Sequence, residues 1–247
     1  MARVAAEARS SPAVVYSILL TLIRHGQAGS RLAYDDLSEI GQEQSRALGK
    51  WFAAQGVRFD AIVTGGLNRQ RMTARGIMAA MDAPPELVID ERWSEFDLDQ
   101  VYAGIGPLLA REDERFRLDY EQLQREVIDP ESSAHRHWQH CDVMVVRAWI
   151  EAGFEFDGES FADFGARVRN ALLAFPSEAH VAVITSATPI AVSAGVALDL
   201  APRRVMQLAG AQRNAAFSEM DLRPGDPRLV SFNNVPHLPD ARLKTLR

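Results

Sequence analysis

The sequence contains a single cysteine, Cys141, among its 247 residues. One thiol cannot form a disulfide within the chain, so the fold depends on a packed core, and we expect the reducing environment of the cytoplasm. Long apolar runs are lacking too: the run Val14–Leu22 has roughly half the length that spans a bilayer. We therefore expect a cytoplasmic protein with no membrane partner.

The sequence also lacks an excess of basic residues. It has 27 Lys and Arg residues and 33 Asp and Glu residues, which gives a formal net charge of -6. Because domains that bind nucleic acid are usually basic, we expect no nucleic-acid partner. A small anionic ligand remains compatible with this charge, since a local cluster of arginines can bind a phosphate inside an acidic protein.

The first residues, 1–12, are small, polar and arginine-containing, and we expect a loose N-terminal arm. Together with the apolar run that follows, they imitate a secretory signal. The run leads directly into Arg24 and His25, however, so we expect it to belong to the fold rather than to a cleaved leader.

Strand patterns and helix patterns alternate along most of the chain. Apolar runs predict strands at 14–22, 59–64, 87–89, 180–185, 215–220 and 228–232, and helical spacing predicts helices at 38–56, 68–81, 161–175 and 190–198. Such alternation is typical of a mostly parallel sheet covered on both faces. We therefore predict an α/β fold, a three-layer α/β/α sandwich with a central, mostly parallel sheet.

Residues 97–157 interrupt this alternation. They are highly charged and carry helical spacing without clear strands. We predict a helical insertion, or cap, over the sheet edge where the loops meet. The chain 1–247 would then be a single domain that contains this insertion, and a homodimer is the default expectation for its assembly.

Arg24, His25 and Gly26 come directly after the first predicted strand. Open α/β folds bind their ligands at the carboxyl ends of the strands. Gly26 allows the backbone to turn sharply and to approach an anion closely. The stretch therefore predicts a phosphate site in which an imidazole faces the phosphorus atom.

Further motifs follow this stretch in a fixed order. They are Leu37-Ser38-x-x-Gly41-x-x-Gln44, Gly66-Leu67-x-Arg69-x-x-x-Thr73-Ala74, Trp93-x-Glu95, Gly158-Glu159-Ser160 with Arg167 further on, and Asn214 before a strand. With Arg-His-Gly-Gln-Ala at residues 24–28, this ordered set resembles the histidine phosphatase superfamily, the phosphoglycerate-mutase-like proteins, over about residues 19–238. The resemblance implies phosphoryl chemistry on a small phosphorylated substrate, with no cofactor.

The resemblance also implies a role for each matched residue. His25 would be the nucleophile, forming a phosphohistidine that water then hydrolyses. Arg24 and Arg69 would bind the phosphoryl oxygens through their planar guanidinium groups. Glu95 would protonate the leaving oxygen and later activate water, which requires a raised pKa.

One position departs from the family pattern. Ser186 stands where the family usually has a second histidine, and a serine donates a hydrogen bond but carries no charge. Losing that cation would cost roughly a hundred-fold or more in rate. This departure disfavours a mutase. It leaves a phosphatase acting on a small phosphomonoester, or alternatively a weak or inactive relative that binds a phosphorylated ligand.

The expected substrate-binding residues are Gly26, Gln27, Ser186 and Ala187. For contacts to the leaving group the resemblance gives no guidance, and the candidates are Gln27, Arg31, Tyr34 and Arg111.

A metal site at His135, His137, His140 and Cys141 is the remaining alternative. Zinc sites usually combine ligands from separate elements, whereas these residues share one charged helical tract without a second ligand group. We therefore expect a solvated helix surface there and no metal.

Overall fold

The computed structural model describes residues 18–29, 34–128, 138–175, 179–223 and 225–246. Its centre is a six-stranded sheet in the order β3-β2-β4-β1-β5-β6. The strands are β1 (Ile18–Arg24), β2 (Ala61–Thr64), β3 (Leu87–Ile89), β4 (His180–Thr185), β5 (Phe217–Arg223) and β6 (Asp226–Asn234). The first four pair in parallel, and β5 and β6 add antiparallel pairs. The predicted arm, residues 1–12, lies outside the described residues.

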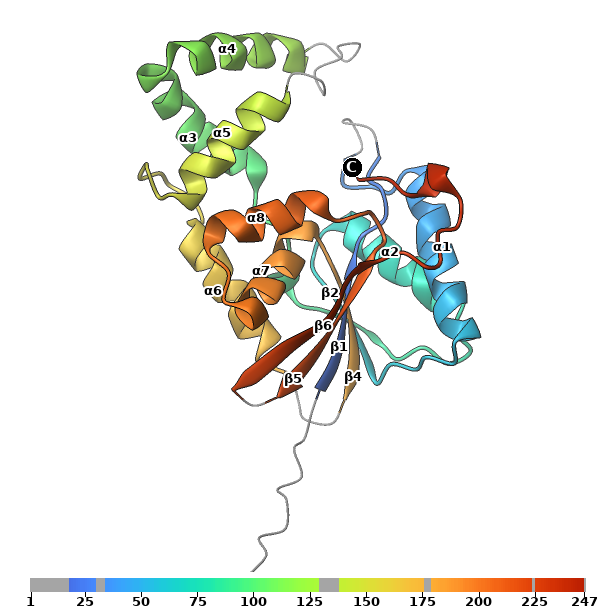
Figure 1. The fold of residues 1–247 in the computed structure, drawn as a ribbon. Coiled ribbons are helices and arrows are strands. Elements are labelled where there is room, and N and C mark those ends of the chain that lie inside the picture. The colour runs from blue at the N-terminus through green and yellow to red at the C-terminus, as the bar shows by residue number, and fades with distance from the viewer. Residues whose placement is uncertain (1–17, 30–33, 129–137, 176–178, 224, 247) are drawn as a thin grey trace, which may run out of the picture.

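Helices cover both faces of the sheet (Figure 1). On one face lie α1 (Glu39–Ala54) and α2 (Asn68–Met78). On the other lie α6 (Phe161–Leu172) and α7 (Ala187–Leu198), with α8 (Pro202–Ala211) packed against α7. The predicted three-layer α/β/α fold is confirmed.

The central strands are buried on both faces, which explains their continuous apolar sequences. Leu20 and Leu22 of β1 belong to the core beneath α6 and α7. Ile23 belongs to the opposite core, with Leu48 of α1 and Ile77 of α2. Burial of each such side chain contributes roughly 1.5–3 kcal/mol to the free energy of unfolding, so the central strands are held rigidly between the two helical layers.

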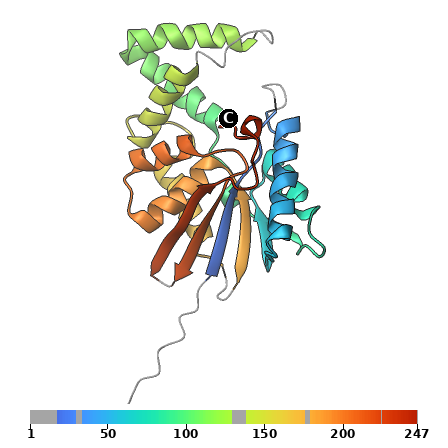
Figure 2. The same cartoon turned by 45° about the vertical axis from the view of Figure 1, so that its right-hand side comes forward.

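The predicted helical insertion is present as α3 (Leu98–Glu112), α4 (Glu114–Ile128) and α5 (Trp138–Ile150). In Figures 1 and 2 these helices stand above α6 and α8, on one side of the sheet and at the end of the molecule to which the carboxyl ends of the parallel strands point. Helix α5 packs against α6 and α8. Phe116 and Val145 are fully buried between them. Cys141 lies in the same core, where burial raises the pKa of its thiol to about 11. The division of the chain into one domain with an inserted cap stays a prediction.

Several elements differ from the sequence-based expectation, either in existence or by a few residues in their bounds. Helix α8 has no counterpart among the predicted elements, although Pro202 at its start and the buried pair Val205 and Ala209, four residues apart, are typical of a helix. Strand β1 continues to Arg24, two residues beyond its predicted end, because Arg24 still pairs with Thr185 of β4. Among the helices that the structure describes, none is both long enough and apolar enough to cross a membrane.

His237, after β6, is buried near the ring of Phe217. Burial lowers the pKa of its imidazole from 6.5 to about 4. As the pH falls below 6.5, the His237 imidazole is therefore protonated in the unfolded chain but stays neutral in the folded chain. The free energy of unfolding should decrease until the pH reaches about 4, where the folded chain is protonated as well. The expected loss from this residue is about 3 kcal/mol.

Urea unfolding between pH 7 and pH 4 measures this loss. Burial also lowers the pKa of His25 and of His180, so the difference between the wild type and His237→Phe isolates the contribution of His237. The variant should show the weaker pH dependence, and equal pH dependence in both proteins would contradict the account.

Candidate active site

The register of β1 and β4 brings His25 and Ser186 side by side. Arg24 is aligned with Thr185, and His25 and Ser186 each follow directly in the chain. The His25 backbone N–H donates to the Thr185 carbonyl over 2.8 Å. Both side chains are buried, with exposed fractions of 6% and 1%. The two predicted site positions therefore meet at one sheet edge.

Two glycines allow the chain to cross itself directly after His25. A Cβ atom on Gly26 would lie 2.5 Å from the carbonyl oxygen of Gly41, and one on Gly41 would lie 2.2 Å from that of Gln27. No other residue type fits such a close approach. The crossing also involves the side chain of Gln27, whose Oε1 accepts a hydrogen bond from the Ser38 hydroxyl over 2.9 Å.

The imidazole of His25 is held in one tautomer. Its Nδ1 lies 2.7 Å from the Gly26 carbonyl oxygen, which only accepts, so Nδ1 carries the proton. The other nitrogen, Nε2, accepts from Arg69 Nε over 3.3 Å. Burial, together with the charges of Arg69 and Arg24, holds the pKa of His25 well below 6.5. The ring is therefore neutral at neutral pH, and its Nε2 lone pair faces a guanidinium.

Arg69 lies in the opening turn of α2 and is 8% exposed. Its Nη1 forms an ion pair of 2.9 Å with Asp35, and its guanidinium carbon lies 5.2 Å from the centre of the Tyr34 ring. Asp35 also accepts from the Asn68 backbone N–H over 2.9 Å. The loop before α1 thus fixes the arginine beside His25. Arg31, from the same loop, lies outside the described residues.

Arg24 is held by the C-terminal part of the chain. Its Nη1 donates to the carbonyl oxygens of Gln212 and Leu246, the second over 3.0 Å. Nearby, Gln44 Nε2 donates to the Leu243 carbonyl over 2.7 Å, and the Asn214 backbone N–H donates to Thr245 over 2.9 Å. Residues 243–246 therefore belong to the surroundings of the site, which no local sequence motif indicates.

Glu95 follows a short 3-10 turn, Glu91–Trp93, and reaches the start of α7. Its Oε2 accepts from the Thr188 backbone N–H, and its Oε1 from that of Phe96, each over 3.2 Å. Burial raises the pKa of this carboxyl, while these hydrogen bonds and the charge of Arg69 oppose the rise. Glu95 thus retains its proton to a higher pH than an exposed glutamate does.

Arg167 of α6 fixes the turn that carries Glu95. Its guanidinium forms a two-point ion pair with Glu159 over 2.7 and 2.8 Å. Its Nη1 donates to the carbonyl oxygens of Glu91, Arg92 and Ser94 over 2.9–3.3 Å. The sequence motif includes Glu159 and Arg167 but assigns them no role. The structure places the pair against the backbone of the turn that precedes Glu95.

Ser186 has a buried partner that none of the sequence motifs indicates. Gln70 Nε2 donates to Ser186 Oγ over 2.9 Å, and Gln70 is 0% exposed. The available signal is helical spacing, because Gln70 lies on the same buried face of α2 as Ala74 and Ile77. A polar side chain on such a face indicates a buried hydrogen-bond partner.

Of the remaining residues that the sequence singled out, Ala187 adjoins Ser186, and the others lie on the inserted helices or outside the described residues. The Ala187 carbonyl accepts from Gln212 Nε2 over 2.7 Å, whereas Arg111 is exposed at the end of α3. His140 pairs with Asp119 over 3.0 Å, and His135 and His137 lie outside the described residues. Within the described ranges, no group of three or more metal-ligating side chains is present.

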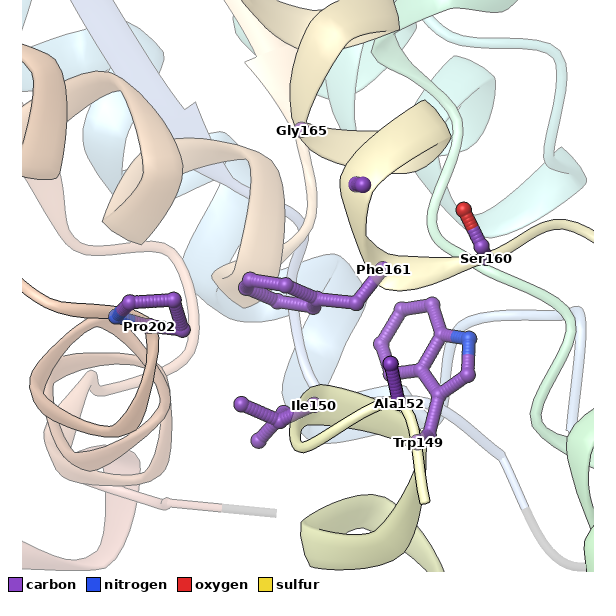
Figure 3. Close-up of a pocket in the computed structure, with 8 residues that line it drawn as sticks. Trp149, Ile150, Ala152, Ser160, Phe161, Gly165 and Pro202 are labelled. Carbon is purple, nitrogen blue, oxygen red and sulfur yellow. The ribbon is translucent and has the colours of Figure 1, made fainter. Parts of the chain in front are cut away.

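An apolar cavity of about 340 Å³ lies elsewhere, where α5, α6 and α8 meet (Figure 3). The ring of Phe161 extends between Pro202 and Trp149. Its lining contains no titratable side chain and none of the residues around His25. The cavity therefore offers no groups for phosphoryl chemistry.

Comparison with known proteins places this arrangement in a family. The model of the histidine phosphatase superfamily (branch 1) matches residues 20–141 and 108–235. A 2,3-bisphosphoglycerate-dependent phosphoglycerate mutase of Methylobacterium sp. (strain 4-46) is 33% identical over 113 residues, which are 42% of this chain and 52% of that protein. The chain thus matches only about half the length of this curated relative.

Solved structures of similar fold include the following two phosphatases. Phosphoserine phosphatase from Entamoeba histolytica, in complex with 3-phosphoglyceric acid, has a TM-score of 0.61 at 20% identity, covering 90% of this chain and 99% of its own. The α-ribazole phosphatase from Shigella flexneri has a TM-score of 0.56 at 18% identity, covering 87% and 96%. Because the family model covers most of this sequence, the chain belongs to the histidine phosphatase superfamily, branch 1.

Proposed function

We propose that this protein is a phosphohydrolase that cleaves a small phosphomonoester through a phosphohistidine on His25. The observation that carries the proposal is the state of the His25 ring, with Nδ1–H bonded to Gly26 and the Nε2 lone pair directed at Arg69. A neutral imidazole in this orientation attacks an electrophile whose oxygens the guanidinium binds.

In the first step, His25 Nε2 attacks phosphorus and the ester P–O bond breaks. Arg69 exchanges its contact with Nε2 for the phosphoryl oxygens, where its charge offsets the charge that develops. Glu95 donates its proton to the departing oxygen. The raised pKa of Glu95 favours this step, because the acid form persists at higher pH.

In the second step, a water molecule attacks the phosphohistidine. The Glu95 carboxylate accepts a proton from this water as the new P–O bond forms and the N–P bond breaks. Inorganic phosphate leaves, and His25 returns to its neutral state. Each group thus ends the cycle in the protonation state in which it began.

The presence of Ser186 in place of a histidine favours hydrolysis of the phosphoryl group over its transfer by a mutase. A mutase must retain the phosphoryl group and return it to its substrate, and a neutral hydroxyl stabilises a bound phosphoryl anion less than a cation does. A phosphatase from the same fold binds 3-phosphoglyceric acid, which supports a small phosphorylated substrate. Binding of a phosphorylated ligand without turnover is the second candidate, and the absent cation favours it.

The test is hydrolysis of p-nitrophenyl phosphate in the presence of a chelator, followed by incubation with 3-phosphoglycerate. We expect equal amounts of p-nitrophenol and inorganic phosphate, and no isomerisation of 3-phosphoglycerate. Isomerisation without release of phosphate would identify a mutase. Saturable binding of orthovanadate, a mimic of the transferred phosphoryl group, without either reaction would identify a binding protein.

A further inference from the structure

Gln70 is a buried amide that the steps above do not use. Its Nε2 donates to Ser186 Oγ over 2.9 Å and to the Trp93 carbonyl over 3.4 Å. Its Oε1 accepts from the Leu67 backbone N–H over 3.3 Å. An N–H group cannot accept and a carbonyl cannot donate, so these neighbours fix which end of the amide faces Ser186.

This orientation determines the direction of the hydrogen bond to Ser186. A hydroxyl has one proton to donate. Since Ser186 Oγ accepts from Gln70, its own proton points elsewhere, and no hydrogen bond among the described residues takes it. Ser186 is 1% exposed and adjoins His25 at the carboxyl edge of the sheet. The hydroxyl is therefore a buried donor beside the imidazole.

We propose that Gln70 is a positioning residue that holds the Ser186 hydroxyl as a donor to a phosphoryl oxygen. The inference rests on the proposed phosphoryl chemistry at His25. An acceptor at position 70 would take the serine proton itself, and no donor would then remain for the substrate. Because the Gln70 amide donates to Ser186 Oγ, the serine proton stays available for a hydrogen bond to phosphate.

Gln70→Glu tests the direction of this hydrogen bond with almost no change in shape. The ionised carboxylate accepts the serine proton, which reverses the bond. The protonated carboxyl donates to Ser186 Oγ and still accepts from the Leu67 N–H, as the amide does. Burial raises the pKa of such a carboxyl, so the donating form is populated on mild acidification.

We expect the kcat of Gln70→Glu on p-nitrophenyl phosphate to be roughly 100-fold below that of the wild type at high pH. The deficit should shrink as the pH falls and the introduced carboxyl is protonated. In a Ser186→Ala background, the same substitution should change kcat little and show no such recovery. Gln100→Glu, on the exposed start of α3, is the matched control and should behave as the wild type does at each pH.

A deficit that is independent of pH, or one that persists in the Ser186→Ala background, would overturn the inference. If Gln70→Glu does not fold, Gln70→Met is a second test, because methionine is similar in volume to glutamine and is apolar. It should lose activity in the wild-type background without recovery at low pH, and lose little in the Ser186→Ala background. An unchanged kcat in Gln70→Met would also overturn the inference.

Orthovanadate affinity separates this inference from the proposed function. If the wild type binds orthovanadate more tightly than Gln70→Met, and Ser186→Ala removes that difference, the inference holds even when no hydrolysis occurs. If His25-dependent hydrolysis occurs without coupling between positions 70 and 186, the inference alone fails. If the wild type neither binds orthovanadate nor hydrolyses the ester, both fail.

Discussion

His25→Ala is expected to lower the hydrolysis of p-nitrophenyl phosphate by roughly 10⁴-fold or more, which brings it to the background rate. The substitution removes the nitrogen that would bond to phosphorus, and neither Arg69 nor Glu95 replaces it in the proposed mechanism. The phosphoryl-enzyme intermediate should disappear with it. Rapid quenching of the wild type at alkaline pH should trap a protein-bound phosphoryl group that is labile to acid, as a phosphohistidine is.

His140→Ala is the matched control for this experiment. His140 is exposed on α5, where it pairs with Asp119, and its loss should leave the rate unchanged. Thermal unfolding of both variants checks that the fold persists. A His25→Ala protein that folds and retains a substantial rate would remove His25 from the role of nucleophile.

Glu95→Gln is expected to have the second largest effect, and its size should depend on the leaving group. Glutamine keeps an oxygen for the Thr188 N–H but cannot donate an acidic proton to the leaving oxygen. Loss of a general acid costs roughly 10²–10⁴-fold in rate. The loss should be large for an alkyl phosphate, whose alkoxide needs a proton, and smaller for p-nitrophenyl phosphate, whose phenolate leaves unaided.

The pH profile provides an independent check on Glu95. With the alkyl phosphate, activity of the wild type should fall as the pH rises through the pKa of Glu95, because the acid loses the proton it must donate. Since burial raises that pKa, the fall should occur at a higher pH than for an exposed glutamate, and it should be absent in Glu95→Gln. Glu86→Gln, at an exposed position, is the control. Equal losses on both substrates would contradict a role in leaving-group protonation.

Much of the fold could be predicted because its elements are locally encoded. Ser38 caps α1 through a bond to the Gly41 N–H over 3.0 Å, and β4 has the predicted bounds His180–Thr185. Helix α8 was missed although its sequence carries helical signals: Pro202 stands at its start, and Val205 and Ala209 share one buried face.

Candidate site residues could be predicted where they follow strand ends or belong to the ordered motifs. His25 and Ser186 are neighbours because β1 and β4 pair in parallel and bring their carboxyl ends to one edge, and the pairing of these two non-consecutive strands is a result of the fold. The contact of Asp35 with Arg69 spans 34 residues, and that of Arg24 with Leu246 spans 222, so neither has a local signature. The roles of His25, Arg24, Arg69 and Glu95 stay predictions until the variants are measured.

The hydrogen bonds of residues 243–246 also have a mechanical consequence. A force applied at Leu246 reaches the guanidinium of Arg24 through the hydrogen bond that Arg24 Nη1 donates to the Leu246 carbonyl. A force applied at the start of β1 enters at the far end of the sheet and is shared in shear by the ladders to β4 and β5. If the protein is attached to a surface or a carrier through the start of β1, a pulling force therefore acts on the hydrogen bonds of the sheet. If it is attached through Leu246, the same force acts on the contacts of Arg24 beside the site.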